Sequence, residues 1–258
     1  MFVKTIDFSK FSSIKVGQST EVLMIERDDN ILNDRIIIGH ANNLLVSPTP
    51  PPLMALSKEF SFIELDNNLL TIGCATPTGK ILSFAKKNNL AGFEFISKLP
   101  GSLGGMIAMN AGLKSYEIFN ILDAIKIDNR WIPKEEIEYG YRFAKLEGIV
   151  TEAKFRVSNG FDNLLLAKLI KLRSNQPKIP SAGSAFKNPE GDYAGRLIDA
   201  VGLKGMQKGA MGWSTIHANF LVNYGGGVFG DAKYLIDLAK KRVFEEFGIF
   251  LKEEIKIL

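Results

Sequence analysis

The sequence feature that most restricts the fold is the stretch at residues 97–112, Ser-Lys-Leu-Pro-Gly-Ser-Leu-Gly-Gly-Met-Ile-Ala-Met-Asn-Ala-Gly. Its proline and glycines predict a loop, and the small apolar residues that follow predict a short helix with little side-chain bulk. Backbone N–H groups at a glycine-rich turn before a helix favour an anion, because unpaired donors and the helix dipole point the same way. A tight turn with a small-residue packing seam explains the stretch equally well, so other motifs must decide.

The composition is that of an ordinary globular protein. The 258 residues suffice for two domains or for one large domain with a lobe, and 46% of them are hydrophobic. The net charge of +4 is spread along the chain without a basic block, which favours an anionic small-molecule ligand and gives no support for nucleic-acid binding. With Cys74 as the single cysteine and no signal peptide or membrane span, we expect a cytoplasmic monomer that binds neither nucleic acid nor membrane.

Hydrophobic patterning predicts a mixture of short strands and helices. Isoleucine- and valine-rich runs at 13–17, 21–26 and 35–39 predict strands, and the prolines at 48–52 mark a boundary. The predicted elements beyond it are a hairpin at 60–65 and 69–74, helices at 78–88, 162–174, 194–202 and 231–247, strands at 124–128, 149–157 and 219–223, and a final strand at 249–257. The segment 173–189 is polar and framed by prolines, which predicts a long functional loop.

A second polar turn follows the predicted strand at 35–39. It begins Gly39-His40-Ala41-Asn42-Asn43 and leads into an apolar run. Small and polar residues directly after a strand let a nucleotide approach backbone donors, although a simple hairpin turn explains the same residues.

Several separated blocks, taken together, resemble the UDP-N-acetylenolpyruvoylglucosamine reductase family, flavoenzymes of bacterial peptidoglycan synthesis. The matching blocks occur in the family's order at 39–46, 99–112, 141–142, 173–189 and 194–223, with a weaker one at 247–255. The spacing from Arg142 to Ser184 is too short for the tyrosine-bearing substrate loop of one branch, so the chain resembles the shorter-loop, type II branch.

The resemblance implies an α/β (α+β) fold in three parts. Two α/β subdomains at 1–47 and 48–158 would form an FAD-binding lobe of the PCMH type, and 159–258 would form an α/β substrate-binding domain whose last strand returns toward the active site. A Rossmann fold is not expected, because no Gly-x-Gly-x-x-Gly opens a βαβ unit.

The resemblance also implies that FAD is bound and that NADPH donates the hydride. Two turns would hold FAD, mainly through backbone N–H groups. The residues are Gly39, His40, Ala41, Asn42, Asn43 and Leu44 in one turn, and Pro100, Gly101, Ser102, Gly104, Gly105, Asn110, Ala111 and Gly112 in the other. The chain departs from the family in two places. Its Gly39-His-Ala-Asn-Asn replaces the usual Gly-Gly-Gly-Ser-Asn, and Lys98 stands where glycine is common.

Three catalytic positions follow from the same resemblance. Arg142 would neutralise the carboxylate of UDP-N-acetylglucosamine enolpyruvate and the enolate that develops. Ser184 would protonate the carbon next to the one that receives the hydride, and Glu254 would assist that protonation. The product would be UDP-N-acetylmuramate. The expected substrate-binding residues are Tyr141, Lys187, Asn188, His217 and Asn219.

Each of these residues has a simpler explanation when taken alone. Arg142 would be a surface arginine and Ser184 a loop serine, and Glu254 is preferred over Glu253 only because the motif selects it. His40 and His217 lack metal-ligand spacing, so no metal site is expected. Two functions from other classes stay open at this point, a flavin oxidase that shares the FAD lobe and a non-catalytic flavin or nucleotide-sugar binding protein.

Overall fold

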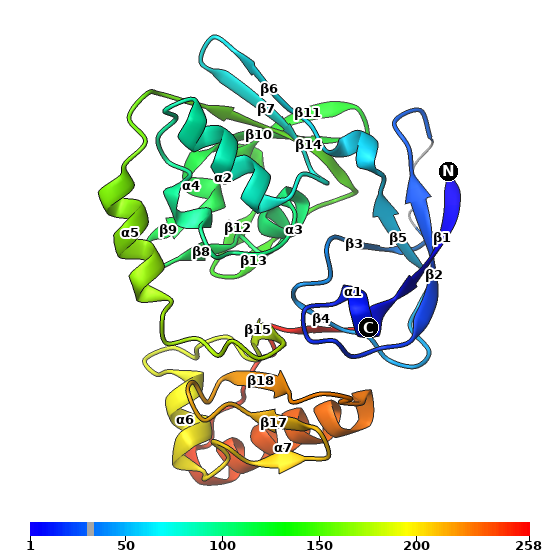
Figure 1. The fold of residues 1–258 in the computed structure, drawn as a ribbon, viewed down its shortest axis with the longest axis vertical. Coiled ribbons are helices and arrows are strands. Elements are labelled where there is room, and N and C mark those ends of the chain that lie inside the picture. Colours follow the sequence, from blue (N-terminus) through cyan, green and yellow to red (C-terminus); the bar gives the residue numbers. More distant parts are fainter. Residues whose placement is uncertain (30–33) are drawn as a thin grey trace. The chain divides into compact units, whose positions relative to one another are not determined.

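A computed structural model describes residues 1–29 and 34–258 and shows a mixed α/β fold (Figure 1). These residues pack into two compact units. Unit 1 consists of Met1–Lys4, Val22–His40 and Pro52–Ser174, and unit 2 consists of Thr5–Glu21, Ala41–Pro51 and Asn175–Leu258. Both units therefore combine segments that lie far apart in the sequence.

The first sheet has the strand order β1-β2-β5-β3. Its strands are β1 (Phe2–Asp7), β2 (Ser19–Ile25), β5 (Leu53–Leu56) and β3 (Ile36–Ile38). Strands β2, β5 and β3 run parallel, and β5 is buried along most of its length, as expected for the centre of a parallel sheet. The predicted strands at 21–26 and 35–39 are confirmed as β2 and β3.

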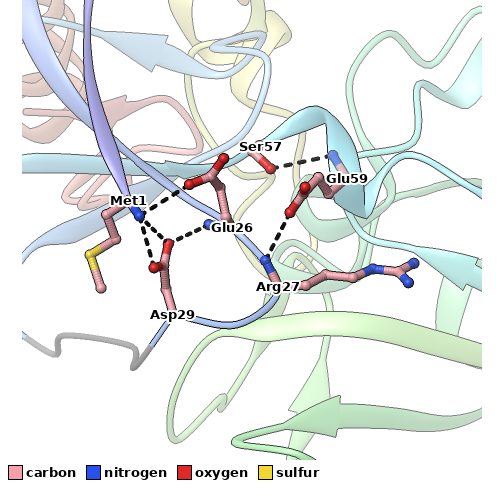
Figure 2. A network of polar contacts seen from close by, with 6 residues as sticks. All are labelled: Met1, Glu26, Arg27, Asp29, Ser57 and Glu59. Atoms are coloured by element: carbon pink, nitrogen blue, oxygen red, sulfur yellow. Dashed lines mark hydrogen bonds and ion pairs between the residues drawn. The ribbon is translucent and has the colours of Figure 1, made fainter.

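Polar contacts join the start of β1 to the end of β2 (Figure 2). The N-terminal amine of Met1 donates to Glu26 Oε2 at 3.1 Å and to Asp29 Oδ1 at 2.8 Å, and this amine holds the pKa of Asp29 below its usual range. The Arg27 N–H donates to Glu59 Oε2 at 3.0 Å. These contacts hold the start of β1, the end of β2 and the 3-10 turn at Lys58–Phe60 together within unit 1.

The larger sheet of unit 1 has the order β11-β10-β14-β7-β6. Its strands are β11 (Arg130–Pro133), β10 (Leu122–Ile127), β14 (Val150–Arg156), β7 (Leu69–Gly73) and β6 (Ile63–Asp66). All neighbours pair antiparallel. Alternate residues such as Ala153 and Phe155 are fully buried, which is the period expected for a sheet with one covered face. The predicted hairpin is confirmed as β6 and β7.

Short helices complete unit 1. They are α2 (Thr78–Lys87), α3 (Leu103–Ala108), α4 (Ile118–Ile121) and α5 (Asn163–Leu172), with 3-10 turns at Lys58–Phe60, Glu94–Ile96 and Lys134–Glu136. Apolar residues of α2, α3, α4 and α5 share one core with the larger sheet. The loop and short helix predicted at 97–112 are confirmed, because α3 begins directly after the Pro100–Gly101 turn.

Two small hairpins of unit 1 carry predicted site residues. One joins β8 (Gly112–Leu113) to β9 (Tyr116–Glu117), and the other joins β12 (Tyr139–Gly140) to β13 (Phe143–Ala144).

Unit 2 is built on a sheet with the order β15-β18-β17-β16. Its strands are β15 (Ser181–Ser184), β18 (Phe220–Asn223), β17 (Met211–Trp213) and β16 (Gln207–Lys208), and its helices are α1 (Phe8–Phe11), α6 (Ala194–Ala200) and α7 (Phe229–Phe247). Helix α7 packs against β16 and β17 (Figure 1). It ends at Gly248, whose φ of 67° is left-handed. Strand β4 (Leu44–Leu45) pairs parallel with β19 (Lys256–Ile257).

Three sequence-based element predictions are wrong in part. Residues 13–17 form no strand, because Lys15 and Gly17 have positive φ values of 58° and 122°, while Ile14 and Val16 are buried in the core of unit 2. Of the predicted final strand, only β19 forms. The predicted irregular segment 173–189 contains the strand β15.

The compact units divide the chain differently from the predicted boundaries at 47 and 158. Compactness alone assigns no ligand to either unit, so the division into FAD-binding and substrate-binding domains stays a prediction. Within 1–29 and 34–258, every helix is too short or too polar to cross a bilayer.

We expect Asn223→Ala to lower the free energy of unfolding by about 3 kcal/mol, because several buried groups lose their partner at once. The Asn223 side chain is 3% exposed. Its Nδ2 donates to the carbonyl oxygens of Ile14 and Lys15 at 3.0 Å, and its Oδ1 accepts from Gly225 N and Gly227 N at 2.9 Å. Urea unfolding measures the change. In the control Asn88→Ala, an exposed amide is lost, and the cost should be about 0.5 kcal/mol or less; an equal cost for both variants would contradict the anchoring role.

Candidate functional site

The two turns predicted to hold a cofactor meet within unit 1. A Cβ placed on Gly39 would lie 2.6 Å from Ser102 Oγ, and His40 forms a hydrogen bond with the backbone of Gly101. Ser102 is buried, and its Oγ accepts from Gly105 N at 3.5 Å at the start of α3. The structure therefore brings Gly39 and His40 beside the 100–105 turn. Residues 41–44 of the first turn belong to unit 2.

The first backbone N–H groups of α3 already have partners inside the protein. Leu103 N donates to the Thr76 carbonyl at 3.0 Å, and Gly104 N donates to the Cys74 carbonyl at 2.9 Å. Free helix donors are therefore not what this loop offers. It offers a backbone surface with little side chain, since Gly39 and Gly105 are both exposed.

The residues just before the loop show two further features. Ser97 is 3% exposed, and its Oγ has no hydrogen-bond partner among the described residues. Lys98 has a φ of 62°, a left-handed conformation that glycine adopts without strain. This geometry explains why glycine suits the position that lysine occupies in this chain.

Arg142 lies in the turn between β12 and β13, with a left-handed φ of 58°. Its Nη2 donates to the Gly112 carbonyl at 3.1 Å and its Nη1 to the Asn110 carbonyl at 3.4 Å. Nη1 also lies 3.7 Å from Glu117 Oε1. The guanidinium sits 5.0 Å from the centre of the exposed Tyr141 ring. The structure thus connects Arg142 directly to the 110–112 segment.

Asn110 is the centre of this arrangement and is fully buried. Its Nδ2 donates to Glu117 Oε2 at 2.8 Å and to the Gly140 carbonyl at 3.1 Å, and its Oδ1 accepts from Phe119 N at 3.3 Å. The amide therefore ties the end of the glycine-rich stretch to the hairpin that carries Arg142. Asn110 was predicted to bind a cofactor, whereas these contacts give its side chain a role within the protein.

Sequence reasoning missed Glu117. It follows the glycine-rich stretch by five residues and pairs with Gly112 across the β8–β9 hairpin. A Cβ on Gly112 would lie 2.1 Å from the Tyr116 carbonyl oxygen, so only glycine lets the two strands approach. A carboxylate on a hairpin that needs glycine opposite it is a signal that the sequence contained.

Ser184 and Glu254 are brought together within unit 2. The carbonyl of Ala185, next to Ser184, accepts from Glu254 N at 2.8 Å. The side chain of Asn43 adds a third element to this group, since its Nδ2 donates to the Glu254 carbonyl at 2.7 Å. Arg142 belongs to unit 1, and its action on the same substrate as Ser184 and Glu254 stays a prediction.

Asn219 shapes the strand end that carries Ser184. It is 3% exposed. Its Oδ1 accepts from Phe186 N at 3.0 Å and its Nδ2 donates to the Phe186 carbonyl at 2.8 Å. Both ends of the amide are therefore used to hold the backbone two residues beyond Ser184.

A cavity of about 330 Å³ opens beside Ser184 in unit 2. Its lining residues are Ser184, Asn188, Tyr193, Gly195, Arg196, Asp199, Ile216, His217, Ala218 and Asn219. Four of the predicted residues, Ser184, Asn188, His217 and Asn219, thus border one space. Lys187 lies in the same segment, and its N–H donates to the Lys252 carbonyl at 2.9 Å.

His217 is held in one orientation at the cavity wall. Its Nδ1 accepts from Asn219 N at 3.3 Å, so the neutral ring carries its hydrogen on Nε2. Burial lowers the pKa of His217, and the positive charge of Lys204 lowers this pKa further. The ring is therefore a neutral hydrogen-bond donor near pH 7.

Comparisons with known proteins cover the whole chain. Residues 175–258 match the family model described as UDP-N-acetylenolpyruvoylglucosamine reductase, C-terminal domain. Curated relatives named UDP-N-acetylenolpyruvoylglucosamine reductase are 49% identical in Helicobacter hepaticus, over 98% of both chains, and 48% identical in Campylobacter jejuni, over 98% of this chain and 99% of the relative. A crystal structure titled UDP-N-acetylenolpyruvylglucosamine reductase (MurB) from Thermus caldophilus matches with a TM-score of 0.86 at 30% identity, covering 100% of this chain and 99% of that one.

We expect both histidines to titrate below pH 6.5 in the folded protein, since burial lowers the pKa of His40 and of His217 from that value. The unfolded chain then binds protons that the folded chain does not. The contribution of these two histidines to the free energy of unfolding should therefore be largest above pH 6.5 and fall as the pH drops from 6.5 through their folded-state pKa values. NMR titration of the two imidazole C2–H signals, assigned with His217→Gln, measures the midpoints. A midpoint at or above 6.5 for His217 would contradict its burial at the cavity wall.

Proposed function

Because the chain belongs to the UDP-N-acetylenolpyruvoylglucosamine reductase family and is an oxidoreductase, we propose that it reduces UDP-N-acetylglucosamine enolpyruvate to UDP-N-acetylmuramate. This reaction is a step of peptidoglycan synthesis. The observation that carries the proposal is the 49% identity over 98% of both chains. It favours the reductase over a flavin oxidase or a non-catalytic binder. A cytoplasmic location and a monomeric state are part of the proposal.

The proposed cofactor is FAD, and the proposed hydride donor is NADPH. We assign the FAD contacts of unit 1 to the Gly39–His40 turn and the 100–105 loop, because these two segments lie side by side and Gly39 and Gly105 are exposed. Residues 41–44 and the 110–112 segment complete the proposed FAD contacts. Bound FAD supplies hydride transfer between NADPH and the enolpyruvyl double bond.

We assign the negative charge of the substrate to Arg142. The guanidinium is held by the carbonyls of Asn110 and Gly112, and a guanidinium kept in one plane can bind the substrate carboxylate through two N–H groups. The same group stabilises the negative charge that develops on the enolate during reduction.

Proton delivery is assigned to Ser184, assisted by Glu254. A hydroxyl is a weak acid, so the serine can act only while neighbouring charges stabilise the oxygen that loses its proton. The backbone contact between Ala185 and Glu254 supports this pairing, because it fixes the two segments in register. The Ser184 side chain borders the cavity in which the reacting carbon would lie.

The remaining substrate contacts are assigned around the same cavity. Lys187 and Asn188 would bind the diphosphate or uridine, and His217 would donate from Nε2 to a carbonyl or phosphate oxygen. In unit 1, Tyr141 is assigned as a substrate contact together with Arg142. Asn219 would act through the Phe186 backbone that it holds.

The reaction is tested with the FAD-loaded protein under anaerobic conditions. NADPH should bleach the flavin absorbance, and UDP-N-acetylglucosamine enolpyruvate should restore it with formation of UDP-N-acetylmuramate. Arg142→Ala should slow the second step by about 10²- to 10³-fold, the usual cost of removing a group that stabilises a developing anion. The control Arg130→Ala removes an exposed arginine of unit 1 and should leave both steps unchanged. Bleaching without any reoxidation by this substrate would rule out the proposed reaction.

Gly39→Ala should weaken FAD binding by about tenfold, a change of roughly 1.4 kcal/mol. The added methyl group would lie within 2.6 Å of Ser102 Oγ and force that side chain from its position at the start of α3. Gly79→Ala is the matched control, because a Cβ there meets nothing within 4 Å. Fluorescence titration of the apoprotein with FAD measures both. Equal affinities for the two variants would show that this turn does not grip the cofactor.

A further inference from the structure

We propose that Glu117 is the positioning residue for Arg142: its carboxylate holds the guanidinium in the plane in which it meets the substrate and links that plane to the glycine-rich segment. The inference rests on the proposed function of Arg142 and adds a residue to it.

The two oxygens of the Glu117 carboxylate have different partners. Oε2 accepts from Asn110 Nδ2 at 2.8 Å, and Oε1 faces Arg142 Nη1 at 3.7 Å. Asn110 is fully buried and is also bonded to the Gly140 carbonyl and to Phe119 N. One oxygen is therefore fixed by a rigid amide, and the other is presented to the guanidinium at a set place.

The Glu117 carboxylate adds to the carbonyl contacts that hold the Arg142 guanidinium. The residue stands in a short turn with a left-handed φ of 58°, and its neighbours Tyr141 and Phe143 are exposed. A long side chain on an exposed turn has many rotamers, and a guanidinium must be confined to one of them to act in the reaction. The carbonyls of Asn110 and Gly112 fix its two ends, and the carboxylate adds charge on the same side.

Partial burial strengthens the ion pair between Arg142 and Glu117. The side chains of Arg142 and Glu117 are 18% and 23% exposed, so water screens this pair less than it screens a surface pair. The position of Glu117 is fixed, because β9 packs so closely against Gly112 that a side chain at residue 112 would overlap the β9 backbone. The hairpin, the amide and the carboxylate thus form one rigid support.

Glu117→Gln isolates this role, because an amide cannot replace both contacts. A carboxylate offers two acceptor oxygens, whereas glutamine offers one oxygen and one NH₂ group. Whichever way the amide turns, a donor faces either Asn110 Nδ2 or the Arg142 guanidinium. The change removes the charge while it keeps the size of the side chain, so the fold is retained.

The experiment uses the FAD-loaded protein and follows each half of the reaction separately. In Glu117→Gln, flavin reduction by NADPH should be unchanged, while reoxidation by UDP-N-acetylglucosamine enolpyruvate should slow by about 10- to 100-fold, the range expected for a misplaced catalytic group. Glu117→Asp, which keeps the charge and both acceptors, should recover part of the rate. The flavin spectrum and the melting temperature of Glu117→Gln should match those of the control Glu152→Gln. This control breaks a similarly buried ion pair of unit 1, Lys126–Glu152 at 2.9 Å.

A double variant decides between positioning and an independent effect. If Glu117 acts through Arg142, Glu117→Gln should add no further loss in an Arg142→Ala background. Additive losses overturn the inference, and so does a normal reoxidation rate in Glu117→Gln when Arg142→Ala alone is slow. A normal rate in Arg142→Ala alone overturns the inference too, but there the failure lies in the proposed function of Arg142.

Discussion

Buried asparagine amides hold the loops on which the rest of the structure depends. Asn110, Asn219 and Asn223 are 0%, 3% and 3% exposed, and each has backbone partners for both its NH₂ group and its oxygen. An amide removed from water destabilises the fold unless both ends are bonded, so each of these residues accepts only one arrangement of the loop around it. Irregular segments that could adopt many conformations are thereby restricted to one.

This constraint explains how candidate site residues can stand on short turns and still be well placed. Arg142 lies on a two-stranded hairpin of minimal length, and Ser184 at the end of a bulged strand. Neither element is stiff by itself. The Asn110 and Asn219 amides form hydrogen bonds with backbone groups close to Arg142 and to Ser184. The carboxylate of Glu117 links the Asn110 amide to the Arg142 guanidinium. Rigidity at the site therefore comes from buried polar contacts more than from regular secondary structure.

Local patterns in the sequence were sufficient for the elements that depend on local forces. The α3 loop, the β6–β7 hairpin and the α7 helix were all predictable from glycine, turn residues and helical spacing. The irregular structure of residues 13–17 was not predictable, because the apolar side chains of Ile14 and Val16 pack into the core of unit 2 without forming a strand. Family motifs supplied Arg142, Ser184 and Glu254, but they could not show that Asn110 and Asn219 use their amides internally. Glu117 was missed because its contact with Arg142 joins two hairpins that lie far apart in the sequence.

Unit 2 is assembled from separate segments of the chain, and this affects how the chain folds during translation. Its segments Thr5–Glu21 and Ala41–Pro51 are synthesised early, yet their partners lie in Asn175–Leu258, and the bond from Asn43 to Glu254 spans 211 positions. Most of unit 1 is the continuous stretch Pro52–Ser174, which can gather its core while ribosomes are still producing the remainder. The early segments of unit 2 gain their partners only when Asn175–Leu258 has been made, so unit 2 can complete its core only at the end of synthesis.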